Sequence, residues 1–116
     1  MCCTFPQREL WERNRYVYID WVIPNGDMLD SITAMPGDTL VFIWEGNDNV
    51  FLMTGEDAFD RCSFQGATFQ SDGNLERGPE FWVQYTIPRF VQGPLYFGCG
   101  VGGHCFAGQK IRIDLD

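Results

Sequence analysis

The stretch that decides the fold is rich in glycine and reads Pro94-Leu-Tyr-Phe-Gly-Cys-Gly-Val-Gly-Gly-His-Cys-Phe-Ala-Gly-Gln-Lys110. Leu95, Phe97 and Cys99 fall on one face of an expected strand, and apolar residues alternate again over 111–115. The glycines between these two segments allow backbone conformations that are closed to other residues. The pattern therefore predicts two strands, each with a buried face, joined by a loop that folds tightly back on itself.

That loop carries three side chains with metal-binding chemistry. They are Cys99, His104, which is the only histidine of the protein, and Gln109. We expect the folded loop to bring them close together. A thiolate, an imidazole and an amide oxygen at one point suit a thiophilic metal and copper above all, because trigonal copper sites use two histidines and a cysteine with a long axial Met or Gln.

The spacing of these residues resembles the cupredoxins, and within them the phytocyanins of the stellacyanin type. That family's signature is a Cys, a His five residues later, a second Cys directly after the His, and an axial Gln ten residues after the first Cys. Cys99, His104, Cys105 and Gln109 match it position for position. The resemblance implies an all-β, Greek-key β-sandwich of the cupredoxin type and an electron-transfer function rather than an enzyme.

The resemblance continues upstream and then departs from the family at one residue. The segment 37–42 resembles the strand that leads to the first histidine ligand, and Asp48-Asn-Val50 resembles the family's His-Asn-Val. Asp48 thus stands where that histidine is expected. The implied site is Asp48, Cys99, His104 and Gln109 around one copper ion per chain, with zinc as a competitor because carboxylates are common zinc ligands.

The family pattern also sorts the five cysteines. It pairs Cys62 with Cys105 in a disulfide and leaves Cys99 for the metal and Cys2 and Cys3 at the terminus. A structural disulfide indicates an oxidising compartment, which predicts an extracellular location or the secretory pathway. No apolar segment follows Met1, so we expect the secretory leader to be absent from this sequence.

Length and charge limit the remaining possibilities. The 116 residues suit one domain over 16–116, preceded by an arm over 1–15. No apolar run approaches the about 20 residues of a membrane span. Sixteen acidic against eight basic residues give a net charge of −8, which excludes nucleic acid as a partner and favours a redox protein with a basic surface.

Periodicity outside the loop also favours strands. We expect strands over 16–23, 39–44, 49–53 and 81–87, a helical turn over 54–59, and a polar connection over 66–78.

Other sites remain open at this stage. Cys62, Cys99, His104 and Cys105 could hold zinc, and Cys99 with His104 could form a nucleophilic pair. A further alternative keeps the fold but abandons the metal site, which leaves a binding or structural module. We favour the copper site, because an idle site has no evident need for a thiol, an imidazole and an amide at the three remaining ligand positions.

Overall fold

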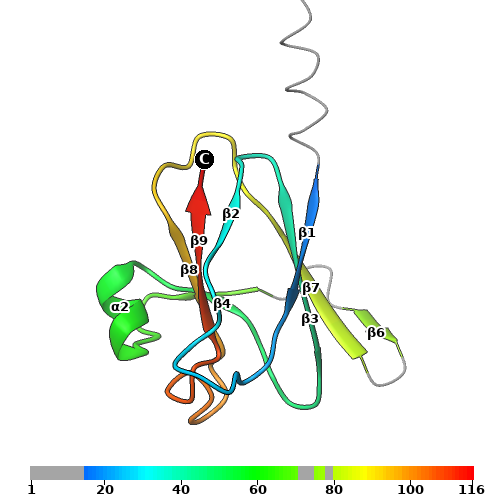
Figure 1. The fold of residues 1–116 in the computed structure, drawn as a ribbon, viewed down its shortest axis with the longest axis vertical. Helices are drawn as coiled ribbons and strands as arrows, with labels where there is room; N and C mark the ends of the chain where they lie inside the picture. Colours follow the sequence, from blue (N-terminus) through cyan, green and yellow to red (C-terminus); the bar gives the residue numbers. More distant parts are fainter. Residues whose placement is uncertain (1–14, 71–74, 78–79) are drawn as a thin grey trace, which may run out of the picture.

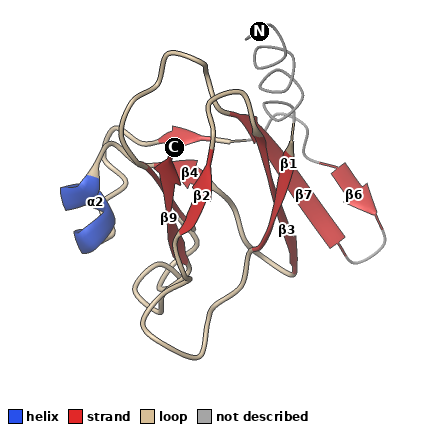
Figure 2. Cartoon of the chain, turned by 45° about the horizontal axis from the view of Figure 1, so that its top comes forward, coloured by secondary structure: helices blue, strands red, loops and turns tan. Residues whose placement is uncertain are grey.

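Two β-sheets face each other in the structure, a computed structural model that describes residues 15–70, 75–77 and 80–116 (Figures 1 and 2). The first sheet has the order β1 (Tyr16–Asp20), β3 (Thr39–Glu45), β7 (Glu80–Thr86), β6 (Leu75–Arg77). The second has the order β2 (Ile32–Ala34), β9 (Lys110–Leu115), β8 (Leu95–Gly98), β4 (Phe51–Leu52), β5 (Thr68–Phe69). The pairs β1–β3 and β2–β9 are parallel and the others antiparallel. The predicted β-sandwich is confirmed.

Aromatic side chains from both sheets fill the space between them. Phe42 on β3 packs against Phe97 on β8, with ring centroids 5.0 Å apart, and Trp21 meets the Phe42 ring edge-on at 5.1 Å. All three side chains are fully buried. Such pairs contribute about 0.5–1.5 kcal/mol beyond their buried area, so they help to set how the sheets stack.

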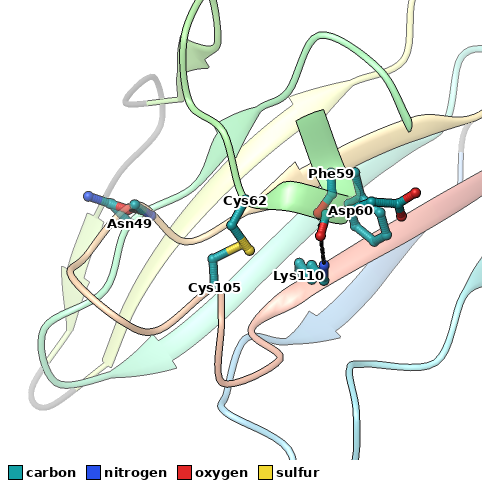
Figure 3. Close-up of a disulfide and its surroundings, with 7 residues drawn as sticks. Asn49, Phe59, Asp60, Cys62, Cys105 and Lys110 are labelled. Atoms are coloured by element: carbon teal, nitrogen blue, oxygen red, sulfur yellow. Dashed lines mark hydrogen bonds between the residues drawn. A yellow bond between two sulfur atoms is a disulfide. The ribbon is translucent and has the colours of Figure 1, made fainter. Parts of the chain in front are cut away.

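The other face of β8 is buried as well, which its alternation did not predict. Helix α2 (Glu56–Arg61) lies outside the second sheet, where Phe59 and Met53 pack with Tyr96. Lys110 holds the helix in place, since its Nζ donates to the Phe59 carbonyl at 2.8 Å and lies 4.7 Å from the Phe59 ring centroid (Figure 3).

Several element boundaries differ from the predicted ones. The first strand ends at Asp20 rather than at residue 23, because Trp21 turns into the core, and the strand over 49–53 is confined to 51–52. The helical turn is present but shifted to 56–61. The prediction of a polar connection over 66–78 was wrong, since this segment contains β5 and β6. The sequence analysis also missed strand β2. β2 and β5 are only two or three residues long, and their place comes from pairing with a neighbouring strand.

The arm over 1–15 falls almost entirely outside the described residues, as do Cys2 and Cys3, so the predicted division into arm and domain stays a prediction. Among the described residues, no helix has the length and apolarity required to cross a bilayer.

A disulfide joins α2 to the glycine-rich loop. Cys62 ends the helix in the left-handed conformation, with φ 53°, and is bonded to Cys105, 43 residues later (Figure 3). The predicted pairing is confirmed. It anchors the chain at the residue that directly follows His104.

The glycine-rich loop also packs against the segment that joins β1 to β2. Gly108 has φ +105°, and a Cβ atom placed on it would lie 2.4 Å from the Asp27 carbonyl oxygen and 3.0 Å from Pro24 Cγ. Only glycine tolerates both this backbone conformation and this close approach. Gly108 therefore allows the loop to close directly before Gln109.

We predict that removing the disulfide with Cys62→Ala and Cys105→Ala lowers the free energy of unfolding by about 4 kcal/mol. The reason is that the bridge links two residues 43 positions apart and thereby limits the conformations of the unfolded chain. Urea unfolding followed by circular dichroism measures this loss. Reduced wild-type protein is the control and should unfold at the same urea concentration as the double variant. A loss below about 1 kcal/mol would contradict the expected role of the bridge.

We predict that Gly108→Ala destabilises the protein by about 2 kcal/mol or more, from left-handed backbone strain together with the contact at Asp27. Gly102→Ala is the matched control in the same loop, because a Cβ atom there meets nothing within 4 Å. Urea unfolding of both variants provides the measurement. Equal stability of the two would show that the close approach at Gly108 carries no energetic weight.

Candidate metal centre

Two loops form the candidate centre at one end of the sandwich, the lower end in Figure 1. The loop between β3 and β4 carries Asp48, and the loop between β8 and β9 carries Cys99, His104 and Gln109. Both loops leave strands whose registers are set by ladder hydrogen bonds within the two sheets. The sandwich thereby brings together residues that lie about 50 positions apart in the sequence.

Backbone hydrogen bonds fold the second loop onto itself. The backbone N–H of Gln109 donates to the His104 backbone carbonyl at 3.0 Å. The backbone N–H of Cys99 donates to the Gln109 backbone carbonyl at 3.1 Å. The His104 amide donates to the Val101 carbonyl at 3.0 Å. This closed loop is the one that its glycines predict, and it places all three predicted donors in one compact turn.

Three donor atoms converge between the loops. Asp48 Oδ1 lies 2.9 Å from His104 Nδ1, and Cys99 Sγ lies 3.6 Å from His104 Nδ1 and 3.7 Å from Asp48 Oδ1. Among the described residues, these form a group of the kind that holds a metal ion, with one ligand atom of each residue within 4.8 Å of the others. The structure thus brings Asp48 to Cys99 and His104, as the alignment with the family predicts.

Cys99 is a buried thiol whose surroundings oppose its ionisation. Burial raises the pKa of the thiol, and the carboxylate of Asp48 raises this pKa further. Backbone amides of Asn49 and Val101 hydrogen-bond to the sulfur and lower its pKa, but burial is the larger effect. In the metal-free protein the thiol is therefore protonated at neutral pH. A metal ion has to displace this proton, since the thiolate is the form that binds metals.

Gln109 is fully buried, and only half of its amide is satisfied. Nε2 donates to the Trp21 carbonyl at 3.0 Å, whereas Oε1 is buried without a hydrogen-bond partner. An unpaired buried acceptor costs about 1–3 kcal/mol. Gln109 also lines a cavity together with Asp48 and His104. The unpaired oxygen is the atom to which the family pattern assigns a weak axial contact.

Two residues hold the loops together. Asn49 Oδ1 accepts a hydrogen bond from the Gly100 backbone amide at 2.6 Å, so this side chain joins the two loops. Trp21 donates from Nε1 to the Asn49 carbonyl at 2.8 Å and accepts from Gln109. Sequence reasoning missed Trp21, because an alternating apolar residue in an expected strand carries no signal of such contacts.

Two alternative sites do not agree with the structure. Cys62 and Cys105 are bonded to each other and have no thiolate to offer zinc, so a site with Cys62, Cys99, His104 and Cys105 is wrong. Cys99 has no exposed surface and keeps its proton, which argues against a nucleophilic pair with His104.

The donor separations match the size of a transition-metal ion. Bonds of about 2.3 Å to sulfur and about 2.0–2.1 Å to nitrogen at a tetrahedral angle put the two ligand atoms about 3.5 Å apart. The observed separation of Cys99 Sγ and His104 Nδ1 is 3.6 Å. Asp48 and His104 lie closer, at hydrogen-bond distance, and would move apart slightly around an ion. The residues present therefore fit a metal.

Solved structures of known proteins share the fold of this chain. No family model matches the chain. Spinach plantacyanin has 30% sequence identity and a TM-score of 0.62, with 87% of this chain and 99% of that chain covered. Cucumber stellacyanin, a structure with Cu2+ at pH 7.0, has 27% identity and a TM-score of 0.62, with 88% and 96% covered.

A curated relative agrees with these structures. The peeling cupredoxin of Cucumis sativus is 37% identical over 85 residues, which are 72% of this chain and 56% of the relative. The chain spans about half the length of the curated relatives it matches. Asp48, Cys99 and His104 fit a phytocyanin-like site with one substituted ligand. By its sandwich, its disulfide and its near-complete match to plantacyanin, the chain belongs to the phytocyanins, a family of cupredoxins.

Proposed function

We propose that the protein is an electron carrier that binds one copper ion per chain through Asp48, Cys99 and His104, with Gln109 as a weak axial donor. The convergence of the three donor atoms carries this proposal. The buried, unpaired Oε1 of Gln109 supports the axial role. Zinc competes for the same donors, because thiolate, imidazole and carboxylate all bind it.

A bound copper ion would supply a one-electron change between Cu(II) and Cu(I). The protein would keep its donor side chains in fixed positions during this change. The disulfide after His104 and the hydrogen bond between Asn49 and Gly100 restrain the two loops. Asp48 adds a second anionic donor beside the thiolate. Negative charge favours Cu(II) over Cu(I), so we expect a reduction potential that is low for a cupredoxin.

The proposed partner is a redox protein with a basic surface, because the chain has a net charge of −8. Cupredoxins are electron-transfer proteins and not enzymes, and this chain is proposed to act as they do. The disulfide is consistent with an oxidising compartment, and we propose an extracellular or secretory location.

We predict that the wild-type protein takes up one Cu(II) ion with a thiolate-to-copper absorption band, and that Cys99→Ser abolishes the band, because serine removes the only thiolate of the donor group. Metal analysis and visible spectroscopy measure both effects. Asp116→Asn is the control and should keep the band, since residue 116 is exposed and lies beyond the far end of β9. If the wild-type protein binds neither copper nor zinc, the metal site is abandoned and the domain is a binding or structural module.

We predict that Asp48→His binds Cu(II) with an intense blue colour and a reduction potential above that of the wild-type protein, because it restores two imidazoles and one thiolate and removes a negative charge. Visible spectroscopy and voltammetry provide the measurements. Asp116→His makes the same exchange at an exposed position beyond the far end of β9, so it should leave spectrum and potential unchanged.

A second substitution at position 48 asks whether the carboxylate is a ligand. Asp48→Ala should lower the affinity for copper if Asp48 binds the metal. Unchanged affinity in Asp48→Ala, or an Asp48→His variant that stays colourless, would show that Asp48 lies outside the coordination sphere.

A further inference from the structure

A cavity of about 430 Å³ opens beside the donor group. Asp48, His104 and Gln109 form part of its wall, whereas Cys99 is fully buried and does not contribute to it. The sulfur therefore lies on the protein side of the donor group, and the cavity approaches the group from the solvent side. A molecule in the cavity would therefore meet the side chains of Asp48 and His104.

The substitution at position 48 leaves the centre short of one nitrogen donor. A trigonal copper site has two imidazoles, and His104 is the only histidine of this chain. The carboxylate of Asp48 is smaller than the ring that it replaces, and its Oδ1 is drawn toward His104 at 2.9 Å. A centre with one imidazole fewer than the family pattern and the space of the cavity thus occur together.

The remaining wall of the cavity selects the kind of molecule that fits. Val22 and Ile23 are about half exposed and form an apolar rim, and Glu45 adds a carboxylate near that of Asp48. Two carboxylates disfavour an anion. A flat neutral ring can pack on the apolar rim, present one nitrogen lone pair to the centre, and donate an N–H to Glu45.

We propose that this cavity binds an imidazole ring from outside the chain, as a further nitrogen donor to the metal. The ring can belong to a small molecule or to a histidine side chain of a partner. This inference rests on the proposed copper function and extends it, because a centre that accepts an outside ligand can change its potential when the ligand binds.

Titration of the copper-loaded wild-type protein with free imidazole tests the proposal. We expect saturable binding of one imidazole, with an added nitrogen coupling in the electron paramagnetic resonance spectrum and a shifted visible spectrum. A second titration uses the end-blocked peptide Gly-Gly-His-Gly-Gly. Binding of the peptide as tight as that of imidazole assigns the site to a histidine side chain, whereas binding of imidazole alone assigns it to a small molecule.

Three variants separate this site from unspecific coordination. Asp48→His should no longer bind imidazole, because its ring supplies the second imidazole and fills the space that the smaller carboxylate leaves beside His104. Glu45→Gln should weaken imidazole about three- to tenfold, from the loss of a charged hydrogen-bond acceptor, and should strengthen the binding of azide. Asp116→Asn removes one charge outside the cavity wall and should change neither the binding of imidazole nor the binding of azide.

Two results would overturn the proposal while copper binding itself stands. One is an unchanged spectrum of the copper-loaded protein in a large molar excess of imidazole. The other is loss of copper to imidazole without a ternary complex, which equilibrium dialysis detects. A wild-type protein that takes up no copper would instead remove the proposed function, and this inference with it. Metal analysis of the wild-type protein alone would detect that outcome.

Discussion

The hydrogen bond from the Gly100 amide to Asn49 Oδ1, at 2.6 Å, is the contact on which the centre depends. It joins the loop with Asp48 to the loop with the other donors, and each loop leaves a different sheet. Gly100 is required for this approach, because a Cβ atom there would lie 2.6 Å from the Phe51 ring. The Asn49 backbone amide adds a second link to that loop, through its hydrogen bond to the Cys99 sulfur.

Trp21 extends this connection into the core. Its indole supports the Asn49 carbonyl, its own carbonyl holds Gln109, and its ring packs edge-on against Phe42. The stacking of the two sheets and the position of Gln109 are therefore linked through one buried residue. A rigid centre of this kind suits electron transfer, because preorganised donors need little rearrangement when the charge of the metal changes.

The exchange of histidine for aspartate changes the electrostatics more than the architecture. The carboxylate still reaches His104 and Cys99, so the donor group persists. It brings a negative charge close to a buried thiol whose pKa is already raised by burial. It also takes less space than a ring and lies beside an open cavity. The same substitution thus accounts for the expected low potential and for the proposed binding of an outside ring.

The sequence by itself determined the strands around the glycine-rich loop and the β-sandwich, and through family resemblance it gave the disulfide and named Asp48, Cys99 and His104, which the structure brings together. Local alternation and fixed spacings carry that information. Only the tertiary structure decided the role of Trp21, the bond between Asn49 and Gly100, the short strands β2 and β5, and the unpaired Oε1 of Gln109. These depend on contacts between segments far apart in the chain, and no local pattern of residues encodes which distant backbone group a side chain will meet.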